Sequence, residues 1–504
     1  MVVGTLPGTI YPFLFNYLNM EGTQVMSATV LLNMPWSFKV FFGMLTDCVP
    51  IWGYRRRPFM VLGWTLCFTM LVAMTCMDAG APYYPDDKYA TMDPHDLTPE
   101  MISTFNESAH HVGGKFVFMM MIAAIGYVAA DVAADAMMVE VAQREPEATR
   151  GYTQTTLYMV RTAFIMVSNI LTGFAFNGKE YGGDFNFSLS FPQLMLVLSI
   201  YCFPVIPISW YFIQEDVHPG IIFRDYLAEL WRLVQMRPMY QVIAYKFLAG
   251  IFENFSVTCF DPMQAYWAKV TPLNEKMMTI VGNGVFAITL YFTGKYGLQW
   301  NWRKMHAVTI VSVVVMEFIV TMLTTWDIAR NQWFWLGVPV AEALPNGIAF
   351  VIATFVMVEL AGEGNEGAVY GMVGSVTNMA LPLASTLTKY VNSHFDVTNT
   401  DIADDSNHVR WEVTYVLLIR YSMNLAALLF LPLLPRQKAE TQQLKHFDGS
   451  SRFMGALTLS YVAISLCGTV MVNVLSIYPA TSCLRIAGGQ GCSSSNSLSS
   501  SHNE

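Results

Sequence analysis

Four ionisable side chains of the amino-terminal half lie inside long apolar stretches: Lys39, Asp131, Asp135 and Arg161. A charge at the centre of a membrane span costs at least about 2.5 kcal/mol, so such a group usually faces a partner or a watery cavity. At 1.5 Å per residue, Lys39, Asp135 and Arg161 all lie roughly 12 Å from the inner ends of their stretches. Asp131 lies one helical turn further out, on the face of Asp135. These groups predict a charged network in which one aspartate takes up a proton.

The carboxy-terminal half offers a similar set at a common depth, namely Glu253, Glu342 and Arg420. Asn283, Asn378 and Asn424 add neutral hydrogen-bonding groups within apolar stretches. A structural reading competes with the functional one, because buried ion pairs often serve architecture alone. A fixed pair between Lys39 and Asp135 explains the first set as well as a substrate or proton role does.

The elements that position these groups are predicted to be membrane-spanning helices. The chain has 504 residues, of which 54% are hydrophobic and 13% charged, whereas a soluble chain carries about a quarter charged residues. A span needs about 20 apolar residues, and its backbone must be helical to satisfy its polar groups. Thirteen windows qualify: 1–20, 26–47, 58–77, 114–138, 153–176, 191–213, 240–262, 277–296, 304–325, 333–358, 366–391, 411–434 and 453–478. The fold class is therefore an all-α polytopic membrane protein.

The distribution of Lys and Arg predicts which loops are cytoplasmic. Placing the loop between the second and third spans inside puts most Lys and Arg inside, with Lys389 and Arg410 among the fewer outer ones. The sequons at Asn106 and Asn186 then fall outside, where they are possible N-glycosylation sites. Cys483 and Cys492 are the two cysteines that could pair outside, if the last window spans.

The windows divide the chain into two halves. Residues 1–213 form an amino-terminal six-helix bundle, 214–239 a cytoplasmic linker with an interfacial helix, and 240–434 a second six-helix bundle. Residues 435–504 hold a connector, the extra span 453–478 and a disordered tail. The first window contains Pro7, Gly8 and Pro12 with no charge before it, so we expect a truncated first helix.

A gating motif is predicted between the second and third spans. Gly43-x-x-x-Asp47 leads to Gly53 and to the run Arg55, Arg56 and Arg57. This pattern resembles, with an insertion, the loop signature of the major facilitator superfamily, whose members have the same six-plus-six arrangement. A gating or topology role is more plausible here than a binding site.

Longer motifs narrow the resemblance. The chain contains Pro35-Trp36-x-x-Lys39-x-x-x-Gly43-x-x-x-Asp47, Gly53-Tyr54-Arg55-Arg56-Arg57-Pro58, Asp131-x-x-x-Asp135-x-x-x-x-Glu140 and Cys483-x-x-x-x-Gly488-Gly489-x-Gly491-Cys492. Together they resemble the folate–biopterin transporter family of the major facilitator superfamily, from Gly4 to Cys492. The resemblance implies uptake of folates or pterins coupled to protons. Such substrates need cations for their carboxylates and acceptors for the aminopyrimidine ring, and Arg and Asp supply them.

Other functions remain open or are disfavoured. The alternatives are a carrier of another organic anion or amino-acid derivative, and a membrane sensor on the same scaffold that does not transport. No phosphate loop or hydrolase motif occurs, so we expect no enzyme, cofactor or metal site. The net charge of −9 is spread along the chain and indicates no nucleic-acid partner. The expected partners are a small anion, protons and the bilayer, with the plasma membrane favoured over an organelle.

Overall fold

The computed structural model describes residues 1–86, 88–89, 98–144, 152–217, 222–360, 366–447, 449–478, 480–489 and 491. Each of the thirteen apolar windows coincides with helical structure. Eight helical segments of the described residues are long and apolar enough to cross a membrane. The all-α polytopic fold expected from the sequence is confirmed.

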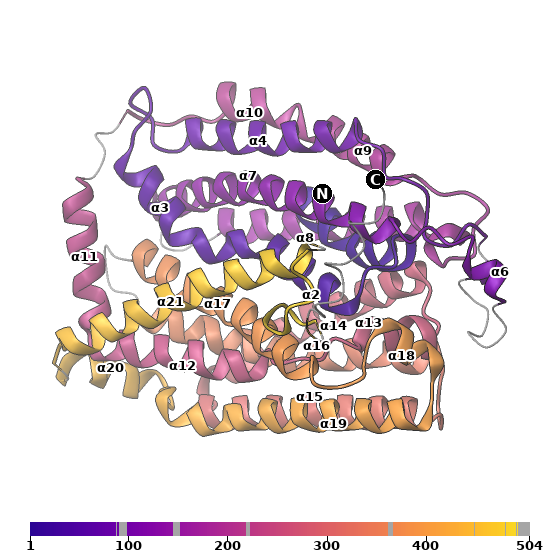
Figure 1. Cartoon of the computed structure of the whole chain (residues 1–504). Helices are drawn as coiled ribbons and strands as arrows, with labels where there is room; N and C mark the ends of the chain where they lie inside the picture. The colour runs from indigo at the N-terminus through magenta and orange to yellow at the C-terminus, as the bar shows by residue number, and fades with distance from the viewer. Residues whose placement is uncertain are drawn as a thin grey trace, which may run out of the picture.

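Helices of the amino-terminal half form the upper layer in Figure 1, where α4, α7 and α10 run side by side. The contact of α4 with α7 is very close, because a Cβ on Gly63 would lie 2.4 Å from the carbonyl oxygen of Gly126. Small residues permit such an approach between membrane helices. The half contains α1 (Val2–Gly8), η1 (Ile10–Tyr17), α2 (Gly22–Asn33), η2 (Met34–Phe38), α3 (Lys39–Cys48), α4 (Arg57–Thr75), α6 (Pro99–Ile102), α7 (Ala109–Arg144), α8 (Tyr152–Ala175), η5 (Lys179–Tyr181), α9 (Phe191–Cys202) and α10 (Val205–Tyr211).

The carboxy-terminal half forms the lower layer, in which α12, α15 and α19 are visible. The seventh predicted span, 240–262, is discontinuous, and Asn424 Nδ2 donates to the carbonyl oxygens of Phe252, Glu253 and Phe255 where the helix is interrupted. The half contains α12 (Arg237–Glu253), α13 (Phe260–Pro262), η6 (Met263–Trp267), α14 (Pro272–Tyr296), η7 (Gly297–Gln299), α15 (Trp302–Thr325), α16 (Gln332–Leu360), α17 (Glu366–Asn392), α18 (Asn399–Asp404), α19 (Asn407–Ala426) and η8 (Ala427–Leu433).

Three further helices connect or flank the halves. In Figure 1, α11 (Phe223–Gln235) stands across the helix ends at the left, and α21 (Arg452–Ile477) lies at the front between the two layers. α21 packs against α2 of the first half and α17 of the second. The remaining elements are α20 (Lys438–Phe447) and η9 (Arg485–Ala487).

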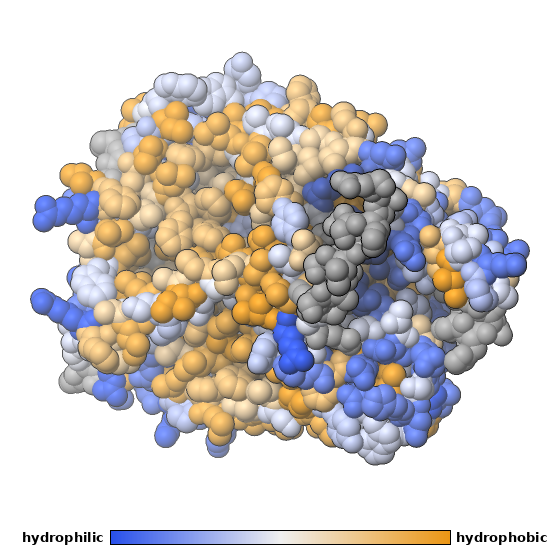
Figure 2. Space-filling view, viewed as in Figure 1, coloured by the Kyte–Doolittle hydropathy of each residue, from blue (hydrophilic) through white to orange (hydrophobic). Residues whose placement is uncertain are grey.

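Two ends of the molecule can be distinguished. The inner end, predicted to be cytoplasmic, carries α11 and the last turn of α3, and the outer end carries α6 and α18. Figure 2 shows hydrophobic side chains over the middle of one face and hydrophilic ones gathered toward the outer end. Such a belt is what a bilayer requires of a protein that crosses it.

Candidate functional site

The second span is interrupted at the level of Lys39. It runs as α2, the 3₁₀ segment η2 with Pro35, and then α3, which begins at Lys39. In a continuous α-helix the Val40 N–H would bond to the Trp36 carbonyl. Here the Val40 N–H donates to Ser375 Oγ at 3.0 Å, and the Trp36 carbonyl accepts from Asn378 Nδ2 at 3.1 Å. Both partners of one helical hydrogen bond thus bind α17 of the other half, and we call this contact the pivot.

Four charged side chains predicted from the sequence meet beside the pivot, and we call them the first charged centre. Lys39 Nζ lies 3.4 Å from Asp131 Oδ2 and 3.2 Å from Asp135 Oδ2. Arg161 Nη1 lies 3.3 Å from Asp131 Oδ1, so its partner is Asp131 rather than Asp135. The four side chains are 21 to 30% exposed, which is high for groups at this depth. The rest of the protein therefore covers these four side chains only partly.

Trp36 belongs to this centre, although sequence reasoning gave it no role. Lys39 Nζ lies 4.6 Å from the centre of its ring, and the Arg161 guanidinium lies 5.5 Å from it. A cation over an aromatic face is stabilised by the ring quadrupole. The spacing of Trp36 from Lys39, three residues on a helix, was the available signal.

A second charged centre lies in the other half around Arg420. Arg420 Nη2 donates to Glu317 Oε1 at 2.6 Å, and both side chains are 11% exposed. Glu342 lies close enough to interact electrostatically with both. The Arg420 guanidinium also lies 4.4 Å from the ring of Phe260. The sequence predicted Glu342 and Arg420 but missed Glu317, which sits in an apolar stretch and could have been found by the same criterion.

Several buried polar atoms of the second centre have no hydrogen-bond partner among the residues that the structure describes. They are Arg420 Nε and Nη1, Glu317 Oε2 and Glu342 Oε1. Buried polar atoms are normally satisfied, so these atoms are available to bond to water or to a bound solute. The second centre can therefore accept further donors and acceptors.

Glu253 does not join the second centre as its predicted depth suggested. Its carboxylate lies 3.0 Å from His306 Nε2, on α15. Equal depth along two spans does not fix the rotation of either helix, so depth alone could not identify the partner. The sequence analysis did not single out His306.

The predicted gating motif is assembled at the inner end. Arg56 Nη2 lies 2.6 Å from Asp47 Oδ1, and Gly53 adopts a positive φ of 82° that suits glycine. The carboxylate of Glu215 accepts hydrogen bonds from the backbone N–H groups of Arg55, Arg56 and Arg57, at 2.8, 2.8 and 2.9 Å. This carboxylate, near the end of the sixth span, holds the start of α4 and was not predicted. Gly43 lies on α3, where a Cβ would meet only Val132 at 4.0 Å.

Lys389 is not in an outer loop, which corrects the sequence interpretation. It lies on α17 and is fully buried. Its Nζ donates to Ser27 Oγ at 2.9 Å, Asn473 Oδ1 at 2.7 Å and Ser476 Oγ at 2.9 Å. Those acceptors belong to α2 and α21, so Lys389 on α17 links the second half to α2 of the first half and to α21.

The remaining predicted sites lie at the outer end. Cys483 is disulfide-bonded, while Cys492, its expected partner, lies outside the described residues. Asn186 is exposed, whereas Asn106 is half-buried and its amide donates to the Ala81 carbonyl at 3.0 Å. Glycosylation at either site remains a prediction. Within the described ranges, no group of three His, Cys, Asp or Glu residues is arranged to hold a metal ion.

Comparisons with known proteins agree with the motifs and the fold. The model of the BT1 family matches residues 3–82. Probable folate-biopterin transporter 4 of Arabidopsis thaliana is 21% identical over 163 residues, which are 32% of this chain and 27% of that protein. The aligned segment thus spans about a quarter of the relative's length.

Solved structures of transporters share the fold. The D-xylose–proton symporter aligns with a TM-score of 0.55 at 13% identity, covering 86% of this chain and 97% of its own. The inward-open xylose transporter XylE of E. coli gives 0.53 at 11% identity, covering 88% and 98%. The nucleoside transporter NupG gives 0.50 at 11% identity, covering 86% and 95%. The chain therefore shares the fold of these transporters, and its residues 3–82, which hold the motifs of the second and third predicted spans, are similar to the BT1 family.

Proposed function

We propose that this protein carries a folate- or pterin-type anion across a membrane by proton-coupled alternating access. The observation that carries the proposal is the pair of charged centres, one in each half, each with a cation against an aromatic ring. Ionisable groups inside spans usually mark substrate or proton pathways. Transporters that bind their substrate between two halves have polar groups of both halves facing the site in this way.

The side chains suit the parts of such a substrate. Two nitrogen donors of Arg420 have no partner in the described part of the chain, and a guanidinium binds carboxylates with paired hydrogen bonds. Asp131 and Asp135 offer acceptors for the amino and ring N–H groups of a pterin. Trp36 and Phe260 offer faces on which a flat heterocycle can stack.

Formal charges suggest how protons and substrate are coupled. Lys39 and Arg161 balance Asp131 and Asp135, so the first centre is neutral when all four are ionised. A proton on either aspartate makes the centre positive and attracts an anion. By linkage, a bound anion favours proton uptake to the same extent. The two ligands raise each other's affinity, which favours their transport together.

Contacts between the halves supply the gate. At the outer end, Tyr11 Oη donates to the Val270 carbonyl at 3.4 Å, and Gly22 N–H donates to Asn399 Oδ1 at 3.3 Å. A polar hollow of about 990 Å³ opens there, and Tyr11 and Val270 are among the residues that line it. We interpret the hollow as the outer entrance, closed at its base in this conformation. Rocking about the pivot opens it.

Uptake into cells expressing the full chain tests the proposal. Labelled folic acid and biopterin are offered at acidic and at neutral outer pH, with and without a protonophore. We expect uptake that is faster at acidic pH and collapses with the protonophore. We expect Asp135→Asn to lose the pH dependence, whereas Glu229→Gln, in an exposed pair on α11, leaves it intact.

Two results would contradict the proposal. Absence of uptake of either compound despite expression at the cell surface would reject the substrate class. Uptake by Asp131→Asn and Asp135→Asn with the pH dependence of the unmodified protein would reject the proton role of the first centre.

A further inference from the structure

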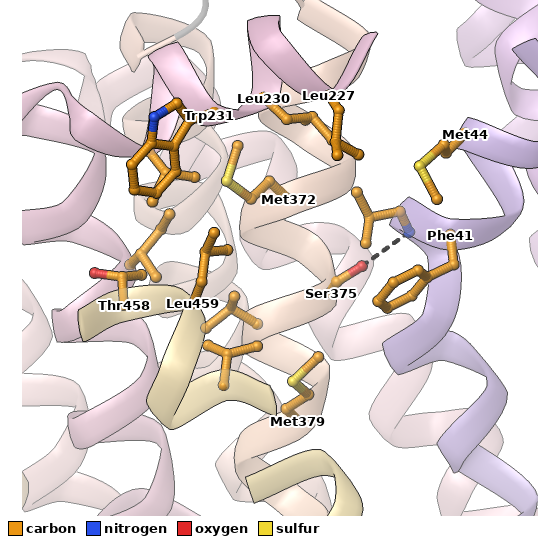
Figure 3. A pocket seen from close by; sticks show the side chains of 15 residues that line it. Phe41, Met44, Leu227, Leu230, Trp231, Met372, Ser375, Met379, Thr458 and Leu459 are labelled. Atoms are coloured by element: carbon orange, nitrogen blue, oxygen red, sulfur yellow. Dashed lines mark hydrogen bonds between the residues drawn. The ribbon is translucent and has the colours of Figure 1, made fainter. Parts of the chain in front are cut away.

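An apolar cavity of about 390 Å³ lies between the halves on the inner side of the pivot. Figure 3 shows side chains entering it from α3, α11, α17 and α21. Ser375 and Thr458 are the polar residues among those that line it, and Ser375 Oγ already accepts the hydrogen bond from Val40. Of the described residues that line the cavity, none is charged. The volume falls in the range of ligand pockets, roughly 300 to 1,000 Å³.

The cavity opens along the apolar flank of the molecule. Phe41, Trp231 and Leu459 line it and remain 47, 36 and 45% exposed. Exposed apolar groups at a cavity mouth would be unfavourable in water, but this part of the chain is predicted to lie in the bilayer. The neighbouring solvent for these groups is then lipid hydrocarbon.

The helix α11 covers the inner end of the cavity. Its apolar residues Phe223, Leu227 and Trp231 recur every four positions and are exposed. Such a stripe is typical of a helix that lies in the membrane interface. Trp231 also approaches α21, because a Cβ on Gly455 would lie 3.4 Å from its ring.

Cations flank this covered end. Arg452 is the first residue of α21 and is exposed, six residues before Thr458, or about 9 Å along the helix axis. Arg232 is exposed on α11 beside Trp231, although it also pairs with Glu229. Basic residues at the cytoplasmic end of a span and on an amphipathic helix attract anionic headgroups.

We propose that this cavity binds one acyl chain of an anionic phospholipid of the inner leaflet, with the headgroup beside Arg452. The apolar lining accommodates the hydrocarbon, and the covered end places the headgroup at the interface. The substrate proposed above is a polar anion, which an uncharged apolar lining would exclude. The two sites therefore differ in chemistry as well as in place.

A lipid in this cavity would regulate transport, because the cavity lies between the two halves. This inference rests on the proposed alternating access. Val40, Phe41 and Met44 line it from the first half, whereas Met372 and Val376 line it from the second. An acyl chain between α3 and α17 opposes their approach at the inner end. Lipid occupancy thus stabilises the conformation described here, in which the outer contacts are closed.

A matched pair of variants on α21 tests the site. Leu459 and Leu457 are 45 and 46% exposed, but Leu459 lines the cavity and Leu457 does not. The full chain is placed in nanodiscs containing phosphatidylglycerol with a photoreactive group near the end of one acyl chain, and crosslinked peptides are identified by mass spectrometry. We expect crosslinks concentrated on α3, α17 and the first half of α21. Leu459→Trp should reduce them severalfold and Leu457→Trp should leave them unchanged.

The headgroup and the fold are checked separately. A phosphatidylcholine probe should label the cavity less than the phosphatidylglycerol probe, and Arg452→Gln should remove that difference. If Leu459→Trp alters the melting temperature, Met44→Trp serves as a second variant, because it fills the cavity from α3. It should reduce the crosslinks in the same way. Equal labelling of the two leucine variants, or labelling spread to exposed positions such as Ile464, would overturn the site. A lack of preference between the two probes would overturn the anionic headgroup. Because crosslinking needs no transport, these results are independent of uptake.

Discussion

Replacing Arg420 tests whether the residues of the second charged centre stabilise one another electrostatically, as the structure indicates. Arg420 contacts Glu317 at 2.6 Å, each side chain is 11% exposed, and Glu342 interacts with both. Removing one member of a buried ion pair costs about 3 to 5 kcal/mol. Arg420→Gln leaves two carboxylates without their cation, so its cost should lie near the upper end. Glu317→Gln leaves Glu342 to balance Arg420, so its cost should lie near the lower end.

The double variant Glu317→Gln with Arg420→Gln shows whether the two side chains stabilise the protein through their mutual interaction or independently of each other. It removes the repulsion between the two carboxylates, so we expect it to be more stable than Arg420→Gln alone. Thermal unfolding of the purified protein in detergent, followed by tryptophan fluorescence, gives the order of stabilities. Arg232→Gln is the control, because exposed ion pairs contribute about 0 to 1 kcal/mol and that side chain is 67% exposed.

Uptake of labelled substrate by the same variants decides the role of the pair. If Arg420 binds the substrate carboxylate, the double variant stays inactive although its stability is partly restored. Recovery of uptake in the double variant would show a structural pair and refute the binding role. A double variant less stable than Arg420→Gln would refute the electrostatic coupling itself.

Three further predictions concern the contacts between helices. Lys389→Met removes the hydrogen bonds to α2 and α21, so we expect the outer end to open more often. The measurement is the labelling rate of a cysteine introduced at Thr23, which is half-buried on α2 and is not an acceptor of Lys389; unchanged labelling would deny Lys389 a gating role. Asn378→Ala deprives the Trp36 carbonyl of its donor and should cost about 1 to 3 kcal/mol; a melting temperature equal to that of the unmodified protein would contradict the pivot. Although burial raises the pKa of Asp405, hydrogen bonds from two arginines lower it below its usual range. Its stabilising effect is therefore present above its unfolded pKa of about 3.9 and lost as the pH falls below that value. The melting temperatures of Asp405→Asn and of the unmodified protein should differ at neutral pH and converge in acid. A difference in melting temperature that does not change with pH would contradict this argument.

The sequence by itself determined the helices and the depth of their charged groups. Apolar windows of span length must be helical in a bilayer, and the windows from 1–20 to 453–478 all coincide with helices. The similar depth of Lys39, Asp131, Asp135 and Arg161 was also predictable, because all four lie at known distances from marked inner ends. Rise per residue converts such distances directly into depth.

Only the tertiary structure decided which groups meet. Glu253 pairs with His306 and Arg420 with Glu317, because helix rotation selects among groups at similar depth. Lys389 was misplaced because a charge near the end of an apolar window resembles a loop boundary. Its acceptors come from α2 and α21, far away in the sequence. A buried cation is tolerated only where such polar atoms converge on it, and their convergence is a property of the packed helices rather than of any one segment.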